Sequence, residues 1–166
     1  MVGIMFLFYM GMSSSWKILG VSMISLNLFT AVSTCYAYGN VLRQEADYRD
    51  VVSTAIINKL LENGYQFGDK VIVLGQERAA PANVPALASN RTLRALVPRI
   101  LGDHDVWGYY VLAKQGLPLN FPSDSEIDAA KMKMAVLTPI YNDFRFYIYK
   151  TGAEFIVYVM TEPSPT

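Results

Sequence analysis

The residues of this 166-residue chain best suited to chemistry lie at its only histidine, in the sequence Asp103–His104–Asp105. Carboxylates beside a histidine can orient an imidazole base or contribute ligands to a metal site. Adjacent residues do not face one point, however, and Asp105 is equally explained as the N-cap of a following helix. We keep all three as candidate binding residues, beside a purely structural interpretation, and assign no metal ligand, cofactor or catalytic residue.

Arginines supply the second candidate group. Arg91, Arg94 and Arg99 are separated by three and five residues, so they lie roughly on one side of a short helix predicted over Thr92–Leu101. Guanidinium groups gathered in this way could bind a phosphate or another anionic head group. A solvated helix face is the alternative. Arg91 and Arg94 are kept as candidate binding residues.

The other chemical patterns are weaker. The residues after Gly75, Gln76–Glu77–Arg78, lack the repeated glycines and the lysine-plus-hydroxyl ending of a phosphate loop. Asp124, Glu126 and Asp128 alternate at a helix start, where negative charge is favourable, and do not indicate a carboxylate pair across a cleft. No pattern in the chain is a self-sufficient catalytic motif.

Composition excludes several classes of function. The 14 basic and 14 acidic residues balance, so the chain lacks the electrostatic signature of a nucleic-acid-binding protein. The single cysteine, Cys35, excludes an intrachain disulfide framework and a cysteine-based zinc site. Lys17 is the only charged residue before Arg43, whereas charges are frequent from there on. The chain is therefore predicted to occupy two environments, an apolar one before Arg43 and an aqueous one after it.

The segment Ile18–Leu42 contains 25 residues and no charge. As a helix it would be about 37 Å long, which exceeds a bilayer hydrocarbon core of about 30 Å. Aromatic and basic residues flank it, with Trp16 and Lys17 at one end and Tyr38 and Arg43 at the other, as is typical of membrane interfaces. The segment is predicted to span a membrane, with the lipid bilayer as its partner.

The first twelve residues, Met1–Met12, are also apolar but too short to span alone. They are interpreted as the end of an earlier spanning helix, joined to the next by a short loop over Ser13–Lys17. A signal peptide is one alternative, although the region before Lys17 is apolar where such a peptide is basic. A lipoprotein-type signal over Val32–Cys35 is another, although threonine before the cysteine matches it poorly. One lysine before the span and two arginines after it, Arg43 and Arg49, do not settle the orientation.

The predicted fold class is α/β: membrane segments over residues 1–43, a small soluble α/β domain over 44–160, and a disordered tail over 161–166. A C-terminal hairpin completes the domain, because two aromatic and β-branched runs flank a short turn. The loop after Gly75 leaves the C-terminal edge of a strand, where open α/β sheets commonly bind ligands. The expected elements are a helix over Gln44–Asn63, a strand over Lys70–Gly75, a loop over Gln76–Asn90, short helices over Thr92–Leu101 and Asp105–Lys114, a helix from a capping box at Ser123 to Lys133, and strands over Phe144–Tyr149 and Phe155–Val159.

The order of these elements resembles the C-terminal end of the bacterial membrane-embedded glucosyltransferases that modify O-antigen, the serotype-converting type. The resemblance covers essentially the whole chain, and it departs from the family in the spacing around Pro139 and Tyr141 and in the additional strand over Phe144–Tyr149. It rests on a last spanning helix running into Tyr38–Arg43, an amphipathic helix like Asp50–Leu61, a short strand like Val71–Gly75, the element Met134–Tyr141, and a final strand like Phe155–Val159.

This resemblance implies a polytopic enzyme of the bacterial inner membrane that transfers glucose from a polyprenyl-phosphate carrier to O-antigen lipopolysaccharide. The chain would be its C-terminal fragment or a separate subunit, with the α/β domain in the periplasm. Polyprenyl-phosphate sugar and the rest of the transferase are then its expected partners. The acidic catalytic residues of the family lie in segments outside the resemblance, so none is carried over to this chain.

The alternative is a single-span, membrane-anchored binding or assembly domain of an envelope complex without catalytic activity. The balanced charge and the lack of a catalytic constellation favour it. A weaker third possibility is an enzyme that uses the loop after Gly75 together with His104.

Overall fold

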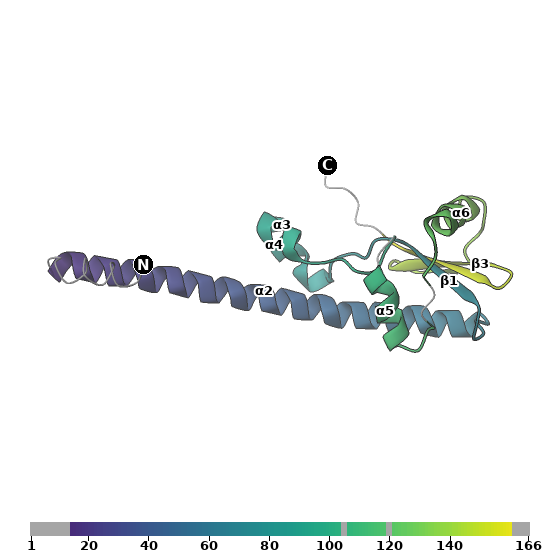
Figure 1. Cartoon of the computed structure of the whole chain (residues 1–166), viewed down its shortest axis with the longest axis horizontal. Helices are drawn as coiled ribbons and strands as arrows, with labels where there is room; N and C mark the ends of the chain where they lie inside the picture. Colours follow the sequence, from purple (N-terminus) through teal and green to yellow (C-terminus); the bar gives the residue numbers. More distant parts are fainter. Residues whose placement is uncertain (1–13, 104–105, 119–120, 161–166) are drawn as a thin grey trace. The chain divides into compact units, whose positions relative to one another are not determined.

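A computed structural model describes residues 14–103, 106–118 and 121–160 (Figure 1). The chain divides into two units, Met1–Val41 and Leu42–Thr166, which are described separately below. The predicted helix end over Met1–Met12 and the predicted tail over Thr161–Thr166 lie outside the described residues.

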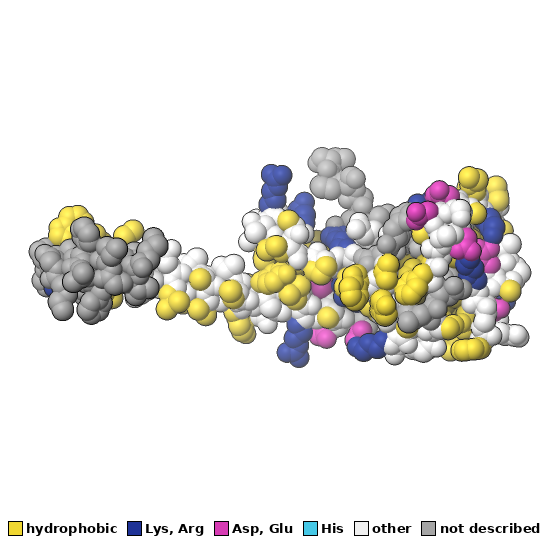
Figure 2. Space-filling model, in the orientation of Figure 1, with side chains coloured by type: hydrophobic (Ala, Val, Ile, Leu, Met, Phe, Trp, Pro, Cys, Tyr) yellow, Lys and Arg dark blue, Asp and Glu magenta, His cyan; other side chains and the backbone are white. Residues whose placement is uncertain are grey.

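The described part of the first unit belongs to α2, a helix that spans Ser14–Glu62. An 18-residue window of this helix has a mean hydropathy of 1.7, and none of that window is buried. Figure 2 shows hydrophobic and uncharged side chains along the visible face of this stretch. Large apolar residues of this stretch are exposed, including Ile24, Leu28 and Phe29 at 65–70%. By length and composition, α2 is able to cross a membrane.

The polar residues of this stretch bond within the helix. Asn27 Nδ2 donates to the carbonyl oxygen of Met23 at 2.9 Å, and Thr30 Oγ1 donates to that of Leu26 at 2.9 Å. Thr34 Oγ1 repeats the pattern with the carbonyl oxygen of Thr30 at 2.8 Å. This bonding within the helix lowers the cost of placing these three polar side chains in an apolar medium.

A mixed four-stranded sheet forms the centre of the second unit. Its order is β1-β4-β3-β2, with β1 (Lys70–Gly75) parallel to β4 (Glu154–Val159) and the other pairs antiparallel. β3 (Phe146–Thr151) and β4 form the predicted C-terminal hairpin, which turns at Gly152 with φ of +61°. The prediction of a long helix followed by an α/β domain is confirmed. The two-residue β2 (Tyr141–Asn142) was not predicted.

The helices correct the sequence-based boundaries. The predicted loop over Gln76–Asn90 contains η1 (Pro81–Asn83), a 3-10 turn, and α3 (Val84–Ser89). α4 (Arg91–Leu96) ends five residues before the predicted Leu101, because Val97 precedes Pro98 and has an extended ψ of 113°. α5 (Val106–Lys114) and α6 (Asp124–Met134) lie close to their predicted ranges.

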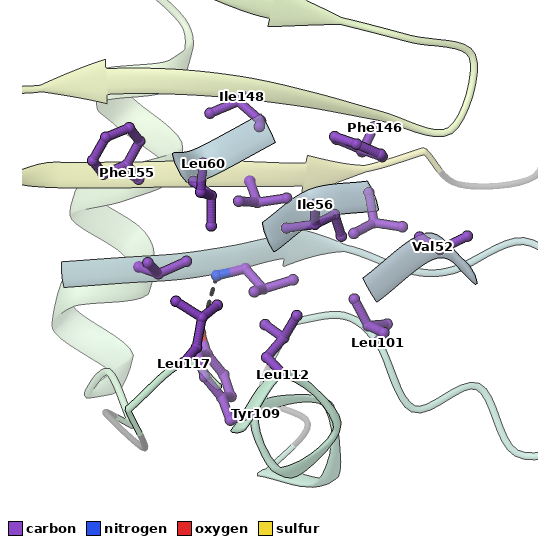
Figure 3. Close-up of a cluster of buried hydrophobic side chains, with 14 residues drawn as sticks. Val52, Ile56, Leu60, Leu101, Tyr109, Leu112, Leu117, Phe146, Ile148 and Phe155 are labelled. Atoms are coloured by element: carbon purple, nitrogen blue, oxygen red, sulfur yellow. Dashed lines mark hydrogen bonds between the residues drawn. The ribbon is translucent and has the colours of Figure 1, made fainter. Parts of the chain in front are cut away.

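One face of the sheet packs against the end of α2 and against α5 (Figure 3). Alternate strand residues such as Val71, Val73 and Phe155 point to this side because strand side chains alternate between the two faces. Fully buried side chains of this size each stabilise the fold by about 1.5–3 kcal/mol. The cluster contains Val52, Ile56 and Leu60 of α2; Tyr109 and Leu112 of α5; Leu101 and Leu117; and Val71, Val73, Phe146, Ile148, Phe155, Val157 and Val159 of the sheet.

The opposite face is covered by α6, whose Ile127 and Ala130 pack against Ile72, Leu74, Tyr149 and Ile156. The predicted capping box starts this helix: the Ser123 N–H donates to Glu126 Oε2 at 2.8 Å. The ion pair with Lys70, followed by the bonds from Ser123, lowers the pKa of Glu126 to about 2. The second unit is therefore a three-layer α/β/α arrangement.

The outer edge of β1 is closed by two side chains. The Val73 N–H donates to the phenol oxygen of Tyr109 at 3.0 Å, and the Gly75 N–H donates to Asp103 Oδ1. Burial raises the pKa of Tyr109 to about 12, so the phenol stays neutral across the physiological range. A strand edge without such partners would be open to pairing with another chain.

Replacing Tyr109 with phenylalanine is expected to lower the free energy of unfolding by about 1–3 kcal/mol, because the buried Val73 N–H loses its acceptor. Chemical denaturation of the full chain in detergent measures this change, and faster amide exchange at Val73 locates it. Tyr110→Phe is the matched control, since Tyr110 is 47% exposed and is expected to change stability by less than about 0.5 kcal/mol. Equal effects of the two substitutions would contradict the edge-closing role.

Candidate functional site

The chain leaves the sheet sharply at Gly75, the last residue of β1. Gly75 has φ of +85°, and a Cβ there would lie 2.0 Å from the carbonyl oxygen of Val159. Glycine alone tolerates this combination of backbone conformation and close approach. The next residues, Glu77 to Ala80, lead into η1 and α3.

A buried ion pair fixes the start of this segment to α2. The Arg49 Nε donates to Glu77 Oε1 and Oε2 at 3.0 and 3.1 Å, and Arg49 Nη2 donates to Oε1 at 2.8 Å. Arg49 Nη2 also donates to the Pro98 carbonyl oxygen at 3.2 Å, and Glu77 Oε1 accepts the Ile100 N–H at 3.0 Å. The pair therefore joins three segments: α2, the chain after β1 and the chain after α4.

A second buried carboxylate lies one helical turn earlier, at Glu45. Both of its oxygens lie 3.0 Å from the Ala80 nitrogen, and Oε1 also accepts the side-chain amide of Asn83 at 3.0 Å. Glu45 and Asn83 are 5% and 2% exposed. Glu45 thus holds the far end of the same segment, so the chain between Glu77 and Ala80 is fixed at both ends.

The segment between Glu77 and Ala80 contributes Arg78 and Ala79 to the wall of a cavity of about 460 Å³. This volume falls within the range of about 300–1,000 Å³ that is usual for small-molecule sites. The polar part of the wall consists of Tyr48, Arg78, Arg94 and Arg99. The apolar part consists of Ala79, Pro81, Val84, Leu87, Ala88 and Phe144.

Two of the arginines are held by backbone carbonyl groups. Arg94 Nε donates to the Leu87 oxygen at 3.2 Å and Nη2 to the Ala88 oxygen at 3.5 Å. Arg99 Nη1 donates to the Glu77 oxygen at 3.2 Å. These bonds limit the rotamers of the two side chains before any ligand arrives, which reduces the entropy lost on binding.

The electrostatic character of the cavity is cationic. Among its described lining residues three are arginines and none is acidic. Burial raises the pKa of the Tyr48 phenol, although the guanidinium groups of Arg145 and Arg78 oppose this shift. The phenol is therefore a neutral hydrogen-bond donor at physiological pH, and it adds to the guanidinium donors.

Of the arginines considered from sequence, the structure brings Arg94 and Arg99 to the cavity but not Arg91, which is exposed on α4. The expectation that all three share one helix is wrong, because α4 ends at Leu96 and Arg99 lies beyond it. Sequence analysis missed Arg78 and Tyr48. The available signal for Arg78 was its place just after the C-terminal edge of β1, which does lead to the cavity.

The acidic candidate group is described only in part, because His104 and Asp105 lie outside the described residues. Asp103 caps the edge of β1 at Gly75 and forms an ion pair with Lys131 at 2.8 Å. Both contacts serve the fold, and Asp103 is not among the residues lining the cavity.

The described lining of the cavity is cationic and apolar. Its described lining offers no carboxylate, imidazole, thiol or aliphatic hydroxyl that could serve as nucleophile or general base at neutral pH. Within residues 14–103, 106–118 and 121–160, no group of three histidine, cysteine or acidic side chains is placed to hold a metal ion. Guanidinium groups beside an apolar wall instead match an anionic organic ligand.

Substituting glutamine for Glu77 is expected to lower the free energy of unfolding by about 3–5 kcal/mol, since Arg49 would remain buried without a counter-charge. Chemical denaturation of the full chain in detergent measures this change in the free energy of unfolding. The double variant Arg49→Met, Glu77→Leu should recover much of this loss, because it removes both buried charges.

The matched control for this pair is Asp47→Asn, which breaks the exposed Arg43–Asp47 pair of α2. That pair is solvent-screened, so the change is expected to stay below about 1 kcal/mol. A Glu77→Gln effect as small as the control would contradict the central role of the buried pair.

Comparison with known proteins gives no assignment. No protein-family model matches the chain, and neither the curated proteins nor the solved structures contain a match. The resemblance to O-antigen glucosyltransferases therefore stays a prediction, and the functional argument rests on the geometry of the chain itself.

Proposed function

We propose that this chain is a membrane-anchored binding domain that captures an anionic ligand in the arginine-lined cavity and does not transform it. The observation that carries the proposal is the presence of Arg78, Arg94 and Arg99 at one cavity, with no acidic residue among its described lining. Guanidinium groups at one cavity attract an anion and can donate charge-assisted hydrogen bonds to it.

The anchor in this proposal is the uncharged segment Ile18–Leu42 of α2. Its apolar side chains are exposed on all sides, which costs free energy in water but not in lipid. Among the described residues, α2 is the one helix long and apolar enough to span a bilayer. Residues from Arg43 onward carry the charges and the folded core, so they form the water-exposed binding domain.

The expected result is that inorganic phosphate binds to the full chain in phosphatidylcholine nanodiscs, as measured by isothermal titration calorimetry. Arg78→Gln and Arg99→Gln should each weaken binding by about 10- to 150-fold, which corresponds to the loss of a charge-assisted hydrogen bond worth roughly 1.5–3 kcal/mol. Affinity should also fall with rising salt concentration.

The matched control is Arg91→Gln, because Arg91 is an exposed arginine of α4 outside the cavity wall. It should bind phosphate as the unaltered chain does. Circular dichroism checks that each variant remains folded. Absence of phosphate binding, or an equal loss in the Arg91 variant, would overturn the proposal.

In a second candidate function, the chain serves as the C-terminal part of a polyprenyl-phosphate-dependent glucosyltransferase. That enzyme would lie in the bacterial inner membrane, with the α/β domain in the periplasm. The cationic cavity favours it, since a carrier of this kind has a phosphate attached to an apolar chain. The DNA immediately upstream of Met1 tests it. In-frame sequence or a neighbouring reading frame that encodes further spanning helices supports this candidate; an upstream stop, an independent promoter and no polytopic sequence overturn it.

A further inference from the structure

The cavity has two chemically different walls, and together they specify more than an anion. The cationic part of its lining consists of Arg78, Arg94 and Arg99, whereas the apolar part includes Val84, Leu87 and Phe144. Val84 and Phe144 are 47% and 67% exposed, so apolar surface at the cavity remains in contact with water. A ligand that covers this surface gains free energy in addition to the attraction of its charge.

The charged group that fits best is a phosphate. A guanidinium has five N–H donors in a planar fork, and Arg94 uses two of them in its bonds to Leu87 and Ala88. Its remaining donors lie at a cavity whose lining also includes the Tyr48 phenol and the side chains of Arg78 and Arg99. A phosphate monoester presents three acceptor oxygens and close to two negative charges at neutral pH, which makes better use of this wall than a carboxylate does.

The body attached to that phosphate is apolar. Beyond the arginines and the tyrosine, the described lining consists of alanine, proline, valine, leucine and phenylalanine, with no side-chain amide or carboxylate. Hydroxyl groups of a sugar placed there would lose water without gaining partners, which is costly. A compact alkyl or aryl group would instead be buried favourably.

We infer that the cavity binds a phosphate monoester carrying a compact apolar group. This inference rests on the proposed anion-binding function and narrows it to one class of ligand. Such a group occurs in two sources, as a soluble alkyl or aryl phosphate and as the head of a simple anionic lipid. Because the apolar wall contributes, affinity should rise by about three- to fourfold for each added methylene until the wall is covered.

The test uses the full chain in phosphatidylcholine nanodiscs and titrates inorganic phosphate, methyl phosphate, butyl phosphate, hexyl phosphate and glucose 1-phosphate by calorimetry. Affinity should increase from methyl to butyl phosphate by about 30-fold or more. Glucose 1-phosphate should bind no better than inorganic phosphate. Val84→Ser, at an exposed apolar position of the lining, should flatten the dependence on chain length, whereas Leu96→Ser, on the exposed surface of α4, should leave that dependence unaltered.

The source is distinguished by repeating the hexyl phosphate titration in nanodiscs that contain phosphatidic acid. Loss of hexyl phosphate binding there supports a lipid-borne phosphate monoester, and unchanged binding supports a soluble one. Equal affinities for inorganic and hexyl phosphate would overturn this inference and leave the proposed function standing. Absence of binding by every phosphate would overturn both.

Discussion

The ion pair between Arg49 and Glu77 is the constraint on which the arrangement around the cavity depends. It connects α2 to the chain after β1, and through Pro98 and Ile100 it connects both to the chain after α4. Burying two charges is expensive, so the pair is compatible with a stable fold only because nearly every donor and acceptor around it has a partner. A bidentate geometry also fixes direction as well as distance, which a contact between apolar side chains does not.

The position of the pair explains why the cavity wall is defined. Arg78 and Ala79 lie between two residues that are bound to α2, Glu77 through its carboxylate and Ala80 through its N–H. Arg99 is likewise flanked by Pro98 and Ile100, both of which contact the pair. The segments that carry Arg78 and Arg99 are therefore held by one buried network, and both side chains line the same cavity without lying close together in sequence.

The strands and helices with strong local patterns were predictable. Lys70–Gly75 is a β-branched run closed by a glycine, and Ser123 with Glu126 is a local capping signal, so neither needs tertiary information. β2 has only two residues, which is too short to show the alternation of apolar and polar residues that identifies a strand. Pro81 and Pro85 favour the predicted loop over Gln76–Asn90. Proline is nevertheless compatible with the first turn of a helix, and both residues lie there, in η1 and α3.

The cavity was less predictable because it is assembled from α2, the chain after β1, α3, α4 and the β2–β3 turn. One signal was nevertheless present in α2. Glu45 and Arg49 continue the helical spacing of Val52, Ile56 and Leu60, so the buried stripe of the helix includes two charged positions. Charges on a core-facing stripe require partners elsewhere in the chain, and Glu77 and Asn83 are those partners.

The buried charges of this domain differ in their surroundings from the charges that line the cavity. Arg49 and Glu77 neutralise each other and are buried, so their charges serve the fold. Arg78, Arg94 and Arg99 instead line a cavity whose described walls carry no acidic residue. A sequence that is locally consistent with its fold elsewhere tends to break such rules where it binds something. Under the proposed function, the anionic ligand accounts for the presence of three arginines at one cavity.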